Sequence, residues 1–189
     1  TLSLVLDICS LDSQVLYFAG PRHPPGAACA VLENAAQKLC HRASYRTGGV
    51  NVVISPWVYA PDAVQPTLQA LFQPGTHRLD FPAGQEISFL AAEDLSLLIF
   101  RLFENWEESR EDYEIPRFFT CTVSHFTELI QKETTDARQK FLFADGEAYS
   151  LPPVSSNTLR KRYAWFPVYS ILEDLPAIAQ FYRNLRRGG

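Results

Sequence analysis

The sequence predicts an α+β fold, with a mixed, mainly antiparallel sheet on which about four to five helices pack. Three observations indicate it. Short alternating or β-branched segments, typical of strands, recur along the chain, and turn residues separate several of them closely enough for hairpins. Other segments carry apolar residues at helical spacing. Strands and helices do not alternate regularly, as they would in a doubly wound parallel sheet.

The first third of the chain is predicted to hold three strands and one helix. Apolar and polar residues alternate along segment 1–9, and a turn separates it from a second strand at 14–19, so a hairpin is expected. Three prolines make 20–26 a loop. Segment 27–42 has the pattern of an amphipathic helix. Its expected inward face consists of Ala28, Val31, Leu32, Ala35 and Leu39. The β-branched run 50–55 favours a strand buried on both faces.

The middle third is predicted to contain two helices and a second hairpin. Asp62 is the expected N-cap of a short helix that ends near residue 72. Strands at 77–81 and 86–90 are joined by a Pro-Ala-Gly turn. The helix at 92–106 has the clearest pattern, with apolar residues around most of its circumference. Such a helix lies inside a core or meets a partner along one side.

The last third is predicted to end in a helix. A strand at 118–123 precedes a helix capped by Ser124. An Asp-Gly turn makes 141–151 the clearest hairpin of the chain. Segment 163–169 is aromatic and contains Pro167, which indicates an edge strand. Asp174 is the expected cap of the final helix, with Pro176 in its first turn. The inward residues of that helix are expected to be Leu175, Ile178, Phe181 and Leu185.

Length and composition favour one globular domain. The chain has 189 residues, 47% hydrophobic and 20% charged, so we expect a single domain over 1–189, with 152–157 as the place of any subdivision. No apolar run is long enough to span a membrane, and no basic signal region opens the chain. The cysteines lack CxxC spacing, so we expect reduced, mostly buried thiols and a cytoplasmic or nuclear protein. These cysteines are Cys9, Cys29, Cys40 and Cys121.

Charge is distributed unevenly along the chain. Residues 1–156 contain 11 Lys and Arg against 19 Asp and Glu, whereas residues 157–189 contain 6 against 2. The densest acidic run is 104–114, and the densest basic run is 160–162. We expect the basic run to recognise an acidic protein surface, either in this chain or on a partner. The predicted partner-binding residues are Arg160, Arg162, Glu107, Glu108 and Glu111.

Motifs of common catalytic sites are absent. The sequence has no GxGxxG, GxxxxGK[ST], GxSxG or HExxH, so no cofactor or metal site is predicted. A two-metal nuclease would need Asp7 on the first strand together with further carboxylates. The chain offers Asp80, Glu86 and Asp94 for that purpose. Cys121 and His125 lie four residues apart across a strand-to-helix junction, which gives a nucleophile and base no defined facing geometry.

These features favour a non-enzymatic protein-interaction domain, such as an adaptor, a chaperone-like protein or a regulatory subunit. A protein partner and a homo-oligomer are both compatible with it. One alternative is a small metal-dependent enzyme that acts on a nucleic acid or a phosphorylated substrate. Another is a single-strand nucleic-acid binder, in which residues 160–162 act with Tyr163, Trp165, Phe166 and Tyr169. The acidic pI of about 5.6 argues against nucleic acid.

Overall fold

The computed structural model describes residues 15–19, 28–43, 50–106, 112–134, 138–150 and 157–188. The chain divides into two compact units, and each is built from three separate stretches of sequence. Unit 1 comprises Thr1–Trp57, Leu97–Pro116 and Pro153–Phe166, and unit 2 comprises Val58–Ser96, Arg117–Pro152 and Pro167–Gly189. We describe each unit by itself. The single domain expected from the sequence stays a prediction, and the expected hairpin at 1–19 begins outside the described residues.

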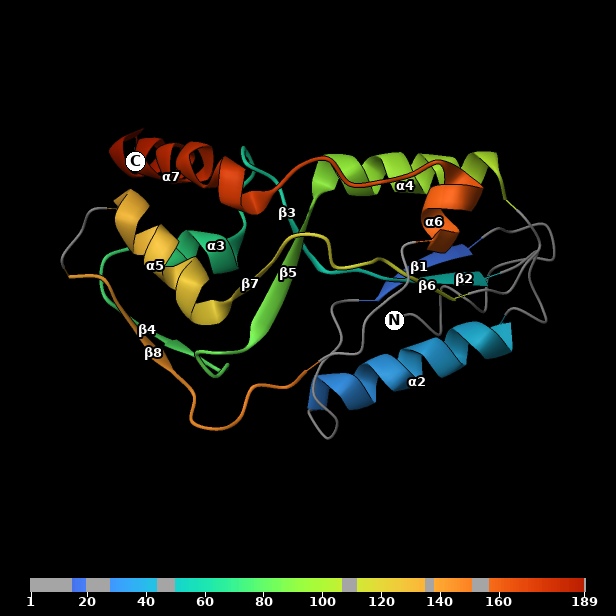
Figure 1. The fold of residues 1–189 in the computed structure, drawn as a ribbon, viewed down its shortest axis with the longest axis horizontal. Helices are drawn as coiled ribbons and strands as arrows, with labels where there is room; N and C mark the ends of the chain where they lie inside the picture. Colours follow the sequence, from blue (N-terminus) through green and yellow to red (C-terminus); the bar gives the residue numbers. More distant parts are fainter. Residues whose placement is uncertain are drawn as a thin grey trace. The chain divides into compact units, whose positions relative to one another are not determined.

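Unit 1 is built on a parallel sheet with the strand order β1-β2-β6 (Figure 1). Parallel neighbours need a crossover connection, and helix α2 provides it between β1 and β2. Cys40 of α2 is buried against Ala19 and Ile54, at the carboxyl ends of these two strands. The elements are β1 (Val15–Ala19), α2 (Ala28–Ala43), β2 (Val50–Ile54), β6 (Asp112–Glu114) and α6 (Asn157–Tyr163). The carboxyl-terminal half of α4 (Ala92–Glu104) also belongs to this unit.

The inward face predicted for α2 is wrong. Val31, Leu32 and Leu39 are 62%, 71% and 37% exposed, whereas Cys40 is fully buried. Ala36, four residues before Cys40, is partly buried. The helix therefore turns small side chains to the sheet, which permits close approach of the two backbones. The larger apolar residues lie on its outer side.

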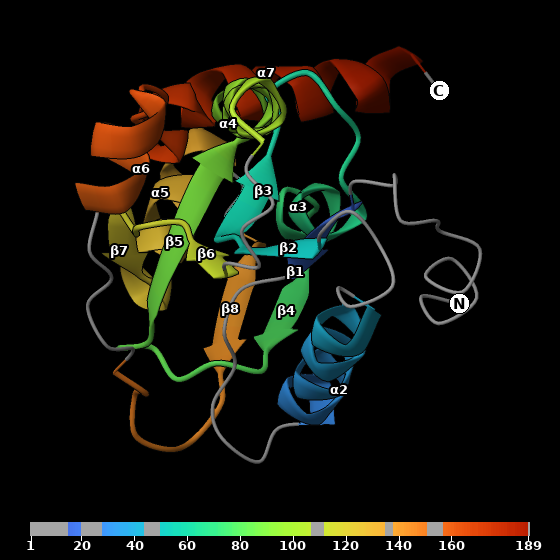
Figure 2. The same ribbon diagram turned by 90° about the vertical axis from the view of Figure 1, so that its right-hand side faces the viewer.

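Unit 2 combines a β3-β5-β7 sheet with a separate β4–β8 pair. Helices α5 and α7 pack against each other, α5 follows β7 directly, and α7 contacts β5 (Figure 2). The strands are β3 (Trp57–Tyr59, which begins in unit 1), β4 (Thr76–Leu79), β5 (Glu86–Ala91), β7 (Thr120–Thr122) and β8 (Lys140–Phe143). The helices are α3 (Pro66–Leu71), α5 (Val123–Thr134), α7 (Ile171–Gly188) and the first part of α4. Fully buried side chains include Tyr59, Phe72, Ile130, Leu175 and Ile178.

The predicted mainly antiparallel sheet is wrong. The β1–β2, β2–β6 and β4–β8 pairs are parallel, and β5–β7 is antiparallel. Six helices lie within the described residues. The error has one physical cause. Turn residues between short strands predict that neighbouring strands pair as hairpins, whereas the partners of a parallel pair lie far apart in sequence.

The segment 141–151 shows this error most clearly. Asp145-Gly146 does form a bend, with Gly146 at a φ of +129°, but residues 147–150 form no strand. β8 pairs instead with β4, so that His77 lies opposite Phe141. The expected edge strand at 163–169 is also wrong, because helix α6 ends at Tyr163 and residues 164–170 are irregular. Within the described part of the chain, no helix is both long and apolar enough to cross a membrane.

Candidate functional site

The carboxyl ends of β1, β2 and β6 are the place in unit 1 where the topology of the sheet predicts a ligand-binding site. In open α/β sheets, ligands bind in the crevice outside the carboxyl ends of the parallel strands. Here the amide of Ser55 donates to the carbonyl of Ala19 at 3.1 Å, and the amide of Ile115 donates to the carbonyl of Ile54 at 2.9 Å. The next residues are Pro56 and Pro116, which have no N–H. None of these four residues, Ser55, Pro56, Ile115 and Pro116, therefore offers a backbone N–H to a ligand.

A buried tyrosine pair fastens α6 to β6 in unit 1. The hydroxyls of Tyr113 and Tyr163 lie 2.8 Å apart and are hydrogen-bonded, and the two rings meet edge to face. Both residues are buried. The pair fixes the end of α6, which carries the predicted basic residues.

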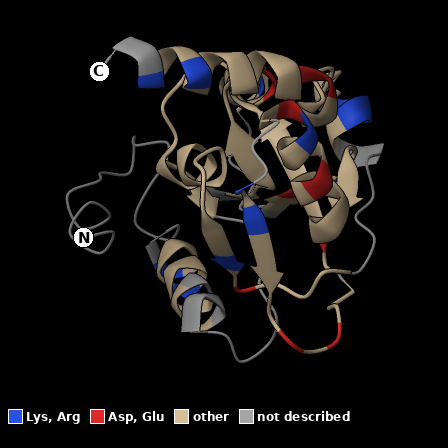
Figure 3. Cartoon of the chain, turned by 90° about the vertical axis from the view of Figure 1, so that its left-hand side faces the viewer, with Lys and Arg blue, Asp and Glu red and all other residues tan. Residues whose placement is uncertain are grey.

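The structure places Arg160 and Arg162 on α6 without testing their predicted partner. The guanidinium of Arg160 lies 5.8 Å from the centre of the exposed Phe166 ring, and that of Arg162 lies 5.6 Å from the ring of Tyr163. Glu107, Glu108 and Glu111 lie outside the described residues, so their pairing with this cluster stays a prediction. Figure 3 shows further Lys and Arg positions on α2, on the β4–β8 pair and on α7.

Half of the aromatic row that follows Arg160–Arg162 is unavailable to stack on bases. Tyr163 and Trp165 are buried, whereas Phe166 in unit 1 and Tyr169 in unit 2 are exposed. A single-strand binder needs several exposed aromatic faces beside its basic residues. The geometry of α6 therefore does not favour the nucleic-acid alternative.

Asp94, a possible metal ligand in the sequence, serves a structural role in unit 2. It is buried at the start of α4, and its carboxylate accepts hydrogen bonds from the amides of Val168 and Tyr169 at 3.0–3.1 Å. The described part of the chain holds no group of three or more His, Cys, Asp and Glu residues that could bind a metal ion. Asp7 lies outside the described residues.

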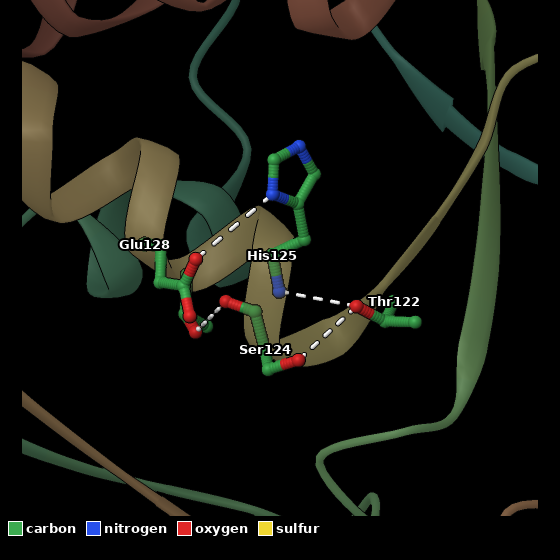
Figure 4. Close-up of polar contacts among 5 residues, drawn as sticks. Thr122, Ser124, His125 and Glu128 are labelled. Atoms are coloured by element: carbon green, nitrogen blue, oxygen red, sulfur yellow. Dashed lines mark hydrogen bonds and ion pairs between the residues drawn. The ribbon is translucent and has the colours of Figure 1, made fainter.

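Polar side chains gather at the amino terminus of α5 in unit 2 (Figure 4). Thr122 caps the helix, in place of the predicted Ser124: its Oγ1 accepts from the amide of His125 at 3.2 Å and lies 3.1 Å from the hydroxyl of Ser124. The Nδ1 of His125 lies 3.9 Å from a carboxylate oxygen of Glu128, and both side chains are mostly exposed.

The amides of this helix terminus already have acceptors. The amide of Val123 donates to the carbonyl of Gln85 at 2.9 Å, and that of Ser124 donates to the carbonyl of Ala83 at 3.0 Å. The side chain of Gln85 in turn binds the backbone of Tyr149 at both its amide and its carbonyl. The cluster is therefore a helix cap that joins three segments, and its donors are not directed at an anion.

Cys121 does not have the character of a nucleophile. Burial raises the pKa of its thiol to about 11, so the thiol stays protonated at neutral pH. The structure gives it no hydrogen bond to His125, whose Nδ1 lies 3.9 Å from a carboxylate oxygen of Glu128. The structure thus agrees with the rejection of a Cys–His pair.

A polar sheet face in unit 2 was missed at the sequence level. In the antiparallel β5–β7 pair, Glu86 lies opposite Thr122 and Ser88 lies opposite Thr120. Opposite residues of an antiparallel pair share a face. Among the described residues the buried hydroxyl of Ser88 has no hydrogen-bond partner. The sequence does carry a signal, since polar and apolar residues alternate in both strands, but it was used only to predict strands.

Comparison with known proteins identifies the fold. No family model matches the sequence, and no curated protein matches it. Solved structures do match. A dTDP-glucose 4,6-dehydratase from Streptomyces venezuelae, with NAD and TYD bound, has a TM-score of 0.70 and 16% identity over 99% of this chain. A UDP-glucuronic acid 4-epimerase from Bacillus cereus, with UDP-glucuronic acid and NAD, has a TM-score of 0.71 and 14% identity over 97%. MoeE5 in complex with UDP-glucose and NAD reaches 0.77 at 12% identity over 98%.

This chain therefore has the Rossmann-like fold of sugar-nucleotide dehydratases and epimerases. It spans 64%, 66% and 70% of the lengths of those three chains. The prediction of a non-enzymatic adaptor or regulatory subunit is wrong in this light, because a fold found in enzymes covers nearly the whole chain. Sequence motifs could not reveal it, since the chain lacks the glycine fingerprint that marks a dinucleotide-binding strand and turn.

The described residues do not fit the NAD that these solved structures contain. A Rossmann site holds the pyrophosphate on backbone amides of a glycine-rich turn after a strand. After β2 and β6 the amides of Ser55 and Ile115 are engaged, and prolines follow. The sequence contains no GxGxxG. We therefore assign no step to a nicotinamide cofactor on these residues.

Proposed function

We propose that this chain binds a nucleoside-diphosphate sugar, as the substrate-binding part of an enzyme of the dehydratase and epimerase class. One observation carries the proposal: 97–99% of the chain follows the fold of enzymes that were solved with TYD, UDP-glucuronic acid or UDP-glucose. The described residues include no group of side chains that could hold a metal ion, and the Cys121 thiol is not reactive; a role in binding needs neither. The engaged amides at the strand ends and the missing GxGxxG do not favour NAD as a ligand of these residues.

The test is a thermal-shift panel on the 189-residue chain. A ligand that binds only the folded state raises its stability by RT ln(1 + [L]/Kd), about 2.7 kcal/mol at a hundredfold excess over Kd. The panel contains UDP-glucose, dTDP-glucose, UDP, dTDP, glucose and NAD. We expect at least one nucleoside-diphosphate sugar to raise the melting temperature in a concentration-dependent way, and we expect NAD to have no effect.

Two results would count against the proposal. If neither nucleoside-diphosphate sugar shifts the melting temperature at millimolar concentration, the chain is not a substrate-binding part. If NAD shifts it strongly and the sugars do not, the residues serve the cofactor, and the reasoning from the engaged amides is wrong.

A further inference from the structure

The β5–β7 pair of unit 2 has two chemically different faces. Successive residues of a strand point to opposite sides of the sheet. One side carries Phe89, whose ring centre lies 4.7 Å from that of Phe126 on α5, together with Ile87 and its cross-strand partner Cys121. The other side carries Glu86 and Ser88 of β5 with their partners on β7, followed along β5 by the buried Leu90. The apolar side belongs to the core beneath α5, so the polar side needs a separate explanation.

Ser88 is the informative residue of the polar side. It is 5% exposed, and its hydroxyl has no hydrogen-bond partner among the described residues. A buried hydroxyl without a partner costs free energy, and most buried polar groups in native proteins are paired. The hydroxyl therefore needs a partner that the described residues do not supply, and a ligand or a water molecule would be such a partner.

The neighbouring side chains define the chemistry of that group. Thr120, directly opposite Ser88, offers a second hydroxyl at an exposed position, and Glu86, two residues along β5, offers an exposed carboxylate. Hydroxyls both donate and accept hydrogen bonds, and a carboxylate accepts from O–H donors. Neither Lys nor Arg belongs to this set, which argues against a phosphate. Thr122 completes the row, but its hydroxyl already serves the cap of α5.

We propose that Glu86, Ser88 and Thr120 form a subsite that binds the hydroxyl groups of the sugar in a nucleoside-diphosphate sugar. This inference rests on the proposed function and adds the part of the substrate that these residues contact. Vicinal sugar hydroxyls match a carboxylate and two hydroxyls because each ring hydroxyl donates one hydrogen bond and accepts others. The diphosphate and the base bind elsewhere on the protein.

The experiment measures binding of a sugar nucleotide and of its nucleotide alone by titration calorimetry. The ligands are UDP-glucose and UDP, or dTDP-glucose and dTDP if that pair binds more tightly to the wild-type chain. The quantity of interest is the affinity ratio between the sugar nucleotide and the nucleotide. Ser88→Ala, Glu86→Gln and Thr120→Val are compared with two matched controls in unit 2, Ser96→Ala and Glu147→Gln. Ser96 is exposed and donates to the carbonyl of Ala92 within its own helix, and Glu147 is exposed in a loop.

We expect each of the three subsite variants to lower the ratio about two- to tenfold, the worth of one hydrogen bond. The affinity for the nucleotide alone and the ratio in both controls should stay at the wild-type values. Ser88→Ala should melt no lower than the wild type, because the free protein loses no hydrogen bond. Glu86→Gln and Thr120→Val, at exposed positions, keep the test valid if Ser88→Ala fails to fold.

Failure of this inference is distinguishable from failure of the proposed function. A wild-type chain that binds neither sugar nucleotide overturns both. If it binds the sugar nucleotide but the ratio is unchanged in all three variants, a water molecule serves Ser88 and the subsite is wrong. The subsite is equally wrong if the sugar adds nothing to wild-type affinity, or if the variants weaken nucleotide alone and sugar nucleotide to the same extent.

Discussion

Removal of the Asp94 carboxylate should strongly lower the free energy of unfolding, because this carboxylate holds the backbone of residues 168–169 in unit 2. The side chain is 2% exposed and accepts from two backbone amides, those of Val168 and Tyr169, through contacts of 3.0, 3.1 and 3.0 Å. Hydrogen bonds to a charged acceptor are worth about 1.5–3 kcal/mol each, so Asp94→Ala should cost about 3–6 kcal/mol. That is a large part of the roughly 5–15 kcal/mol typical of a whole protein.

Equilibrium unfolding in urea, followed by circular dichroism, measures this loss. Asp94→Asn keeps one oxygen acceptor and should lose less than Asp94→Ala, so it supplies a value if the alanine variant does not fold. The neighbouring exposed Glu93→Ala is the control and should stay within about 0.5 kcal/mol of the wild type. A loss below about 1 kcal/mol for Asp94→Ala would show that residues 168–169 are held by other contacts, and the reasoning would be refuted.

Three further predictions concern the burial of single side chains. Burial, and then the hydrogen bond to Asp174, raise the pKa of the Tyr59 hydroxyl above its ordinary value near 10. The contribution of the neutral Tyr59 phenol to the free energy of unfolding is therefore fully present below pH 10 and is lost as the pH rises above it. Urea unfolding at a series of pH values should show this loss in the wild type, and a smaller loss in Tyr59→Phe. The thiol of Cys121, with its pKa near 11, should react slowly with iodoacetamide at pH 7.5 and faster as the pH approaches 11; rapid labelling at pH 7.5 would contradict the burial. Leu98→Ala should cost about 2–5 kcal/mol in urea unfolding because Leu98 is fully buried, whereas Phe100→Ala should cost about 1 kcal/mol or less because Phe100 is 58% exposed. Equal losses at these two positions would contradict the described orientation of α4.

The sequence predicted local structure better than pairing. The β-branched run at 50–55 indicated a strand buried on both faces, and β2 is indeed the central strand of its parallel sheet. The helix at 92–106 was also recognised, because its apolar pattern is long and continuous. Strand partners could not be recognised in this way. The pairing of β4 with β8 joins residues more than sixty positions apart, and no local turn signal encodes it.

The candidate site was harder to predict for a related physical reason. Asp94 was considered as a metal ligand because a carboxylate in the sequence does not reveal its acceptor role toward Val168 and Tyr169. The isolated Ser88 hydroxyl became informative only after the structure showed that it is buried and unpartnered among the described residues. The chain lacks the glycine fingerprint that usually marks a dinucleotide-binding strand and turn, so its sequence motifs do not indicate this fold.

Saturation-transfer difference NMR with UDP-glucose tests the central claim most directly, because it reports which ligand protons contact the protein. The chain is irradiated at its methyl resonances, and UDP and glucose are measured alone under the same conditions. The account predicts saturation of both the uridine and the glucose protons of UDP-glucose, with the glucose signals reduced in Ser88→Ala. The absence of any transfer to UDP-glucose, and equally to dTDP-glucose, would contradict the claim that this fold binds a nucleoside-diphosphate sugar.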